Sequence, residues 1–89
     1  MTTIKDIENT FKPHSDPARA AQMATYMRNQ FDFYGIGASE RRNLSKAYIR
    51  EGKKSNKIDW KFLTTLFSHP YREVNYLGLD ILKAQSHLI

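Results

Sequence analysis

Apolar residues recur at every third or fourth position along almost the whole of this chain, and this spacing constrains its fold more than any other feature. Ile4, Ile7 and Phe11 form the first stripe of this kind, which is typical of a helix with one buried face. No segment shows the sustained alternation of apolar and polar residues that marks a half-buried strand. We therefore predict an all-α fold of about five helices.

Helix start and stop signals divide the first half of the chain. Asp16 followed by Pro17 marks the start of a helix over 17–31, because Asp can cap free N–H groups and Pro fits the first turn. Gly35 and Gly37 then break the chain, since glycine is free to take positive φ. The apolar stripe of the predicted helix consists of Ala20, Met23, Ala24, Met27 and Phe31.

The second half carries similar signals. Ser39 is predicted to cap a third helix, and "EGKKSNK" (51–57) is predicted to be a loop. Asp59 is predicted to cap a fourth helix, and Pro70 to open a fifth. The ranges expected for these three helices are 39–51, 59–67 and 70–84.

The helices also suggest a repeat. They form consecutive pairs at a spacing of about 40 residues, which is typical of HEAT-like helical hairpins that stack into a curved superhelix; the pairs are 17–31 with 39–51 and 59–67 with 70–84. In the last helix, Tyr76 and Leu79 lie off the main apolar face, which indicates a second neighbour. We therefore expect an incomplete solenoid, whose C-terminal helix face could support self-association.

The composition excludes several kinds of site. Eighty-nine residues suit one small domain, so residues 1–89 are expected to form a single helical domain. The absence of cysteine excludes disulfides and favours the cytoplasm. His14, His69 and His87 lack the spacing of metal ligands, so no metal and no cofactor are predicted. No apolar run approaches the roughly 20 residues that span a bilayer, so we expect a soluble cytoplasmic protein without a membrane partner.

The positive charge is concentrated in one segment. The chain has a net charge of +5, but residues 41–57 alone carry seven basic residues and one acid, Glu51, which gives that segment +6. A concentrated basic surface attracts polyanions, above all nucleic acid. A solvated helix and loop that keep the protein soluble would explain the same composition equally well. The basic residues are Arg41, Arg42, Lys46, Arg50, Lys53, Lys54 and Lys57.

A longer stretch resembles a known family. Residues 11–44, "FKPHSDPARAAQMATYMRNQFDFYGIGASERRNL", resemble the start of the AlkD-like DNA alkylation repair proteins through the pattern M-x-x-Y-M-[KR]-[ND]-x-F-x-[FY]-x-G-[IV] followed by R-R. The end of the chain, "HPYREVNYLGLDIL", is similar to the next segment of that family. The resemblance implies HEAT-like helical repeats and a glycosylase that removes cationic alkylated purines from double-stranded DNA.

The resemblance also implies what this chain lacks. The catalytic carboxylate of the family, and the tryptophans and arginine of its lesion cleft, lie in later repeats. Trp60 does not match any of them. We therefore predict a DNA-binding and scaffold portion that has no catalytic residue and no glycosylase activity of its own.

The candidate DNA-binding residues surround the predicted start of the third helix. Ser39, Arg41 and Arg42 could hold a backbone phosphate, because helix N-terminal N–H groups and arginines both bind anions. Neighbouring residues point about 100° apart on a helix, so at most one of the two arginines is expected to grip DNA. The resemblance adds Tyr26. Gly37 departs from the family, whose members can carry a polar residue near the DNA at this position; glycine offers no side chain but could let backbone N–H groups approach a phosphate. Lys46 could add a further phosphate contact.

Several of these residues also fit other roles. Phe31, Phe33 and Tyr34 are more typical of a hairpin core than of a base-stacking platform, which needs exposed rings. Tyr26 could equally close the core with its hydroxyl in water. Two other functions fit the sequence: a helical protein-interaction module that oligomerises, and a small stand-alone nucleic-acid binder.

Overall fold

The computed structural model describes residues 2–89, so Met1, with which the predicted domain begins, lies outside the described residues. Residues 2–89 are all-α, as predicted, and an isolated bridge between Asp32 and Tyr71 is their only strand-like pairing. The α-helices are α1 (Ile4–Phe11), α2 (Pro17–Tyr26), α3 (Ala38–Lys54), α4 (Trp60–Phe67) and α5 (Arg72–Ala84). Two short 3-10 helices, η1 (Lys12–His14) and η2 (Ser86–Leu88), complete the order.

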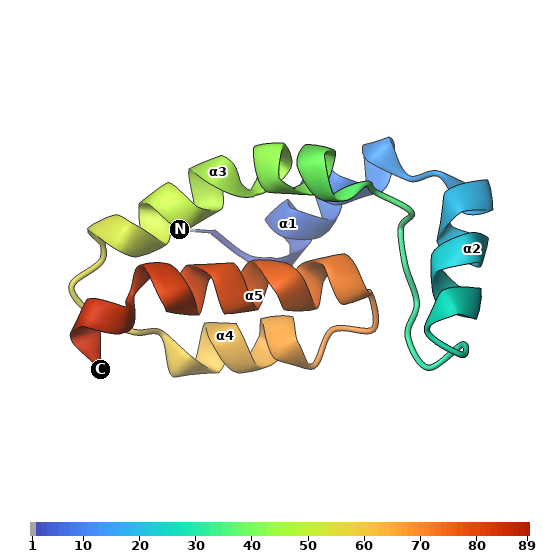
Figure 1. Ribbon diagram of the computed structural model, residues 1–89. Helices are drawn as coiled ribbons and strands as arrows, with labels where there is room; N and C mark the ends of the chain where they lie inside the picture. Colours follow the sequence, from blue (N-terminus) through green and yellow to red (C-terminus); the bar gives the residue numbers. More distant parts are fainter. Residues whose placement is uncertain (1) are drawn as a thin grey trace.

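Helix α5 is the centre of the packing. It lies between α3 and α4 and packs against both, while α1 contacts α3 and α4 (Figure 1). Helix α2 stands across the far end, away from the C-terminus (Figure 1). The core is therefore built mainly from α1, α4, α5 and the segment that leads into α3. Its fully or almost fully buried residues are Ile7, Phe11, Tyr34, Ile36, Leu63, Leu66, Val74, Leu77 and Ile81.

Two predicted helix caps are confirmed. The Asp16 carboxylate accepts a hydrogen bond from the Arg19 N–H at 3.1 Å and thus caps α2. The Asp59 carboxylate accepts from the Phe62 N–H at 3.0 Å and caps α4. The pairing of 59–67 with 70–84 is also confirmed, because α4 packs along α5.

The helix predicted over 17–31 is wrong at its C-terminal end. Helix α2 stops at Tyr26, because Arg28 and Asn29 both adopt φ of 57°, a left-handed conformation that ends an α-helix. The Asn29 N–H closes this turn on the Ala24 carbonyl at 2.6 Å. Phe31 therefore leaves the predicted stripe, and α2 does not pack along α3 as the first predicted hairpin required.

Three other boundaries also differ from the prediction. Gly37, with φ −65° and ψ 155°, is the N-cap of α3, so Ser39 lies inside the helix and does not cap it. The predicted loop 51–57 is helical through Lys54, and Gly52 in this part of α3 packs closely on Ile81. Helix α5 begins at Arg72 rather than at Pro70.

The late start of α5 has a clear cause. The Arg72 N–H donates to the Asp32 carbonyl at 2.8 Å, and Tyr71 takes the extended conformation of the bridge to Asp32. The chain after Pro70 is thus held as an extended N-cap before the helix can begin. This contact joins the start of α5 to the segment between α2 and α3.

A buried carboxylate fixes that segment. Glu73, in the first turn of α5, is fully buried and accepts hydrogen bonds from the N–H groups of Tyr34, Gly35 and Ile36 at 2.9, 3.0 and 3.2 Å. Gly35 has φ of 92°, and a Cβ there would collide with the Asp16 carbonyl oxygen, so only glycine fits. The start of α3 is therefore held rigidly against α5.

The hydrogen bonds between Glu73 and residues 34–36 form what we call the Glu73 clamp. The aromatic residues of this segment strengthen the same contact between α5 and the start of α3. The Tyr34 ring stacks on the Tyr71 ring with centroids 4.1 Å apart and meets the Phe11 ring edge-on at 6.1 Å. Burial, with smaller contributions from the Glu8, Tyr71 and Glu73 charges, raises the pKa of Tyr34 to about 12. Phe33 and Tyr34 are buried, so the prediction that they belong to the core is confirmed.

Candidate nucleic-acid interface

A broad, open hollow lies at the start of α3. It has a volume of about 700 Å³ and brings together four of the predicted DNA-binding residues, Gly37, Ser39, Arg42 and Lys46. Arg19 of α2 also lines it, which the sequence did not indicate. The remaining lining residues are Ala38, Glu40 and Asn43.

The hollow favours negatively charged ligands. Three basic side chains line it, and its only acid, Glu40, faces His14 at 3.5 Å from carboxylate oxygen to Nδ1. No side chain caps the N-terminus of α3, so N–H groups of the first turn keep their hydrogen-bonding capacity. The partial positive charge of a helix N-terminus adds to the basic side chains. A phosphate group matches this combination of donors.

Gly37 determines where the Arg19 side chain lies. A Cβ built on Gly37 would stand 2.8 Å from Nη1 of Arg19, closer than real Cβ contacts. The guanidinium thus occupies the space that a side chain at residue 37 would need. No local sequence signal could reveal this, because the fixed turn at Gly35 brings α2 and the start of α3 together.

Arg41 and Arg42 have different surroundings. The Arg41 guanidinium is 3.3 Å from the Asp80 carboxylate and lies over the Tyr76 ring at 4.9 Å from its centroid. Its side chain is only 15% exposed, and it does not line the hollow. Arg42 is exposed and lines the hollow. The geometry thus gives Arg41 a role in joining α3 to α5 and leaves Arg42 free to meet a ligand.

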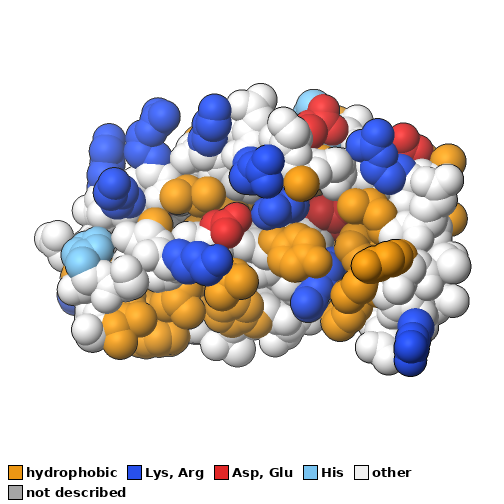
Figure 2. Space-filling view, viewed as in Figure 1, with side chains coloured by type: hydrophobic (Ala, Val, Ile, Leu, Met, Phe, Trp, Pro, Cys, Tyr) orange, Lys and Arg blue, Asp and Glu red, His pale blue; other side chains and the backbone are white. Residues whose placement is uncertain are grey.

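A basic stripe continues from the hollow along α3. We use this name for Arg42, Lys46, Arg50 and Lys53, which are all exposed and follow one another at helical spacing. At roughly 1.5 Å per residue the stripe is about 17 Å long, which is comparable to about five base pairs of duplex DNA. Figure 2 shows Lys and Arg side chains gathered along the α3 edge of this face, with few acidic side chains among them.

Tyr26 lies apart from the hollow at the C-terminal end of α2. It is 87% exposed and lines a shallow depression of its own with Ala21, Gln22 and Thr25. Its ring is therefore not part of the core, which removes the core-closing alternative. The structure places it on the surface next to the α2 turn, where it is free to contact a large ligand.

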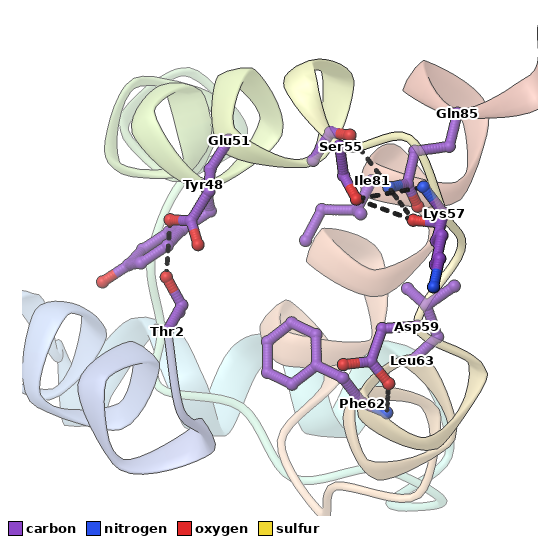
Figure 3. Close-up of a pocket in the computed structure, with 11 residues that line it drawn as sticks. Thr2, Tyr48, Glu51, Ser55, Lys57, Asp59, Phe62, Leu63, Ile81 and Gln85 are labelled. Carbon is purple, nitrogen blue, oxygen red and sulfur yellow. Dashed lines mark hydrogen bonds between the residues drawn. The ribbon is translucent and has the colours of Figure 1, made fainter.

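A second, smaller cavity lies near the other end of α3 (Figure 3). It has a volume of about 170 Å³ between the C-terminal part of α3, α4 and Gln85. Most of its polar groups bond to one another: the Thr2 hydroxyl donates to Glu51 at 2.6 Å, and the Gln85 amide donates to the Gly52 carbonyl at 2.8 Å. Its Asp59 carboxylate caps α4. These contacts give the cavity walls a structural role.

Residues 2–89 contain neither a cluster of metal-ligating side chains nor a helix that could span a membrane. Within this range no three His, Asp or Glu side chains come together as metal ligands would. No helix of the described chain combines the length and the apolar character needed to cross a membrane.

Comparison with known proteins agrees with the resemblance seen in the sequence. A family model described as "DNA alkylation repair enzyme" matches residues 7–88, almost the whole chain. Searches of curated proteins and of solved structures found no match. The match extends over the hollow, the basic stripe and the Glu73 clamp alike. The chain belongs to the DNA alkylation repair enzyme family.

Proposed function

We propose that residues 1–89 form one helical domain that binds the phosphate backbone of double-stranded DNA through the hollow at the start of α3 and the basic stripe. The domain would be the N-terminal, HEAT-like part of a DNA alkylation repair protein that acts in the cytoplasm. Family membership supports a role in alkylation repair. The helical pair α4–α5, packed lengthwise, supports a repeat architecture.

The observation that carries this proposal is the convergence of donors at the hollow. Arg19, Arg42 and Lys46 come from two different helices and meet beside the uncapped N-terminus of α3. One phosphate could accept hydrogen bonds from backbone N–H groups and from a guanidinium there. Further phosphates would follow the basic stripe, and each neutralised phosphate would release counterions from the DNA.

We also propose that this chain does not excise alkylated bases alone. When a cationic alkylated base leaves, positive charge develops on the sugar. A glycosylase would need a free carboxylate to stabilise this charge. Every acidic side chain in residues 2–89 except Asp32 has a structural partner. Helix N-termini bind Asp6, Asp16 and Asp59, and histidines lie beside Glu8 and Glu40. Thr2 bonds to Glu51, backbone N–H groups bond to Glu73, and Arg41 pairs with Asp80. Asp32 is exposed and lines none of the three hollows.

The test is the salt dependence of duplex binding by the purified 89-residue chain. Fluorescence anisotropy with a labelled duplex would compare wild type with Arg42→Gln/Lys46→Gln. A matched control, Lys5→Gln/Lys61→Gln, removes two exposed charges from α1 and α4. The first variant should reduce the slope of log K against log salt by about 1.8, at about 0.9 per phosphate contact, and the control should not.

Two results would contradict the proposal. Equal slopes for the two double variants would mean that binding depends on overall charge and not on this surface. Release of 7-methylguanine from alkylated DNA by the 89-residue chain would contradict the absence of glycosylase activity.

A second candidate function is self-association through the C-terminal helices. Leu79 of α5 and Phe67 of α4 are 44% and 43% exposed, and Gly78 lets α5 approach the Phe67 ring closely. Exposed apolar residues on adjacent helices favour a protein contact. Sedimentation of wild type and Leu79→Glu would decide: a dimer lost in the variant supports this candidate, and a wild-type monomer at high concentration rejects it.

A further inference from the structure

Two aromatic rings pack against the side chain of Arg72, the first residue of α5. Its guanidinium carbon lies 4.2 Å from the centroid of the Phe31 ring and 5.1 Å from that of the Tyr76 ring. Its backbone N–H is fixed as well, through the bond to the Asp32 carbonyl. Arg72 is thus one of the more firmly positioned arginines in a chain whose other basic side chains are largely exposed.

The same guanidinium makes no polar contact within residues 2–89. Its Nε is buried without a hydrogen-bond partner, and no carboxylate forms an ion pair with it. Arg41, which also lies over the Tyr76 ring, shows the contrast because it pairs with Asp80. A buried donor without a partner is costly. Stacking uses the flat faces of a guanidinium and leaves the N–H groups at its edge free for an acceptor.

The position of Arg72 connects it to the proposed DNA-binding surface. The Tyr76 ring contacts both Arg72 and Arg41, and Arg41 belongs to the first turn of α3 beside the hollow. Figure 2 shows Lys, Arg and hydrophobic side chains, with some acidic ones among them, on the face over α3 and α5. An acceptor that reached Arg72 would therefore lie near the start of α3, where basic side chains line the hollow.

We propose that Arg72 is a second phosphate-binding residue, held in place by Phe31 and Tyr76, which contacts the DNA backbone outside the hollow. This inference rests on the proposed function and names an additional contact for the same ligand. A guanidinium suits it because its planar fork can donate two parallel hydrogen bonds to one phosphate. Ordering of the side chain by the two rings reduces the entropy lost when the phosphate binds.

The test follows the side-chain Nε–Hε resonance of Arg72 in the wild-type chain by ¹H–¹⁵N NMR, assigned through its own side-chain carbons. A duplex of about 12 base pairs would be added until the backbone amides of α3 stop shifting. We expect the Arg72 resonance to shift along the same binding curve. An unmoved Arg72 resonance, with shifted α3 amides, would overturn this inference alone. Wild type that fails to bind the duplex would overturn the proposed function as well.

Variants separate ligand contact from a purely structural role. Arg72→Gln should lower the slope of log K against log salt by about 0.9, whereas Lys5→Gln should leave it unchanged. Arg72→Lys should keep the wild-type slope, since it retains the charge, but bind more weakly because it loses the planar fork. If Arg72→Gln lowers the thermal midpoint yet leaves the slope at the wild-type value, the side chain serves only the fold and the inference is wrong.

Discussion

Helices α2 and α5 flank the same clamped segment, yet they are anchored very differently. Helix α5 buries five residues, including Leu77 and Glu73, whereas α2 buries none. The hollow therefore lies between two unlike parts of the molecule: α3 with α5, which is anchored in the core, and α2, which contributes no buried residue. Arg19 and Tyr26 belong to the second side, and Arg42 and Arg72 to the first. This difference predicts that stability depends mainly on the α5 side, whereas the proposed DNA contacts come from both sides.

The largest expected effect comes from truncating one apolar side chain on each side. Leu77→Ala should lower the free energy of unfolding by about 2–5 kcal/mol, because Leu77 is fully buried and leaves a cavity. Met23→Ala in α2 should cost less than about 1 kcal/mol, since Met23 is only partly buried. Urea denaturation measures both. Equal losses would show that α2 is as firmly packed as α5.

The next effect concerns the clamp itself. Glu73→Gln should cost about 2–4 kcal/mol, because one amide oxygen cannot replace a carboxylate that accepts three backbone N–H groups in a buried site. The exposed Glu51→Gln is the control and should change stability by less than about 0.5 kcal/mol. Coinciding denaturation curves for the two variants would show that the Glu73 hydrogen bonds do not stabilise the fold.

A pH effect should follow from Tyr34. Burial raises its pKa to about 12 from 10.0, so the folded state favours the neutral phenol. The stability contributed is fully present below pH 10 and is lost as pH rises towards 12, by roughly 2–3 kcal/mol. Wild type should therefore lose more stability than Tyr34→Phe over this range. Parallel pH profiles of the two proteins would contradict the assignment.

The smallest effect tests the α2 side of the interface. Gly37→Ala should displace the Arg19 guanidinium and weaken duplex binding about threefold with little change in stability, since only a flexible side chain must move. Arg19→Gln should weaken binding to a similar extent. The double variant should bind no more weakly than either single variant, because both changes remove the same contact. Fully additive losses, measured by anisotropy, would show that Gly37 and Arg19 act independently.

Local signals in the sequence predicted much of the fold. Asp16 and Asp59 cap helices because a short side chain meets N–H groups only three residues away, so the sequence nearby contains all the information. Ser39 carries the same signal but lies inside α3, since Glu73 of the distant helix α5 holds residues 34–36 and the helix begins directly after them, with Gly37 as its N-cap. The end of α2 was missed because neither Arg28 nor Asn29 is a glycine, the residue that usually takes positive φ.

The candidate site also contains residues that local sequence brings together and residues that only tertiary contacts place. Gly37, Ser39, Arg42 and Lys46 are close in sequence, and one helix start brings them together. Arg19 lies in the hollow only because of its tertiary contact with Gly37. Arg72 is likewise positioned by tertiary contacts, with Phe31 and Tyr76. Arg41 and Arg42 are indistinguishable by composition, and only the position of Asp80 on α5 decides which of them pairs.

We propose that duplex DNA binds along the start and the exposed face of α3. A ¹H–¹⁵N map of the backbone amides during titration with a short duplex would locate the contact surface. We expect the largest shifts at Ala38, Ser39, Arg42 and Lys46, and small shifts in α4. The largest shifts in α4, or none at saturating DNA, would contradict it.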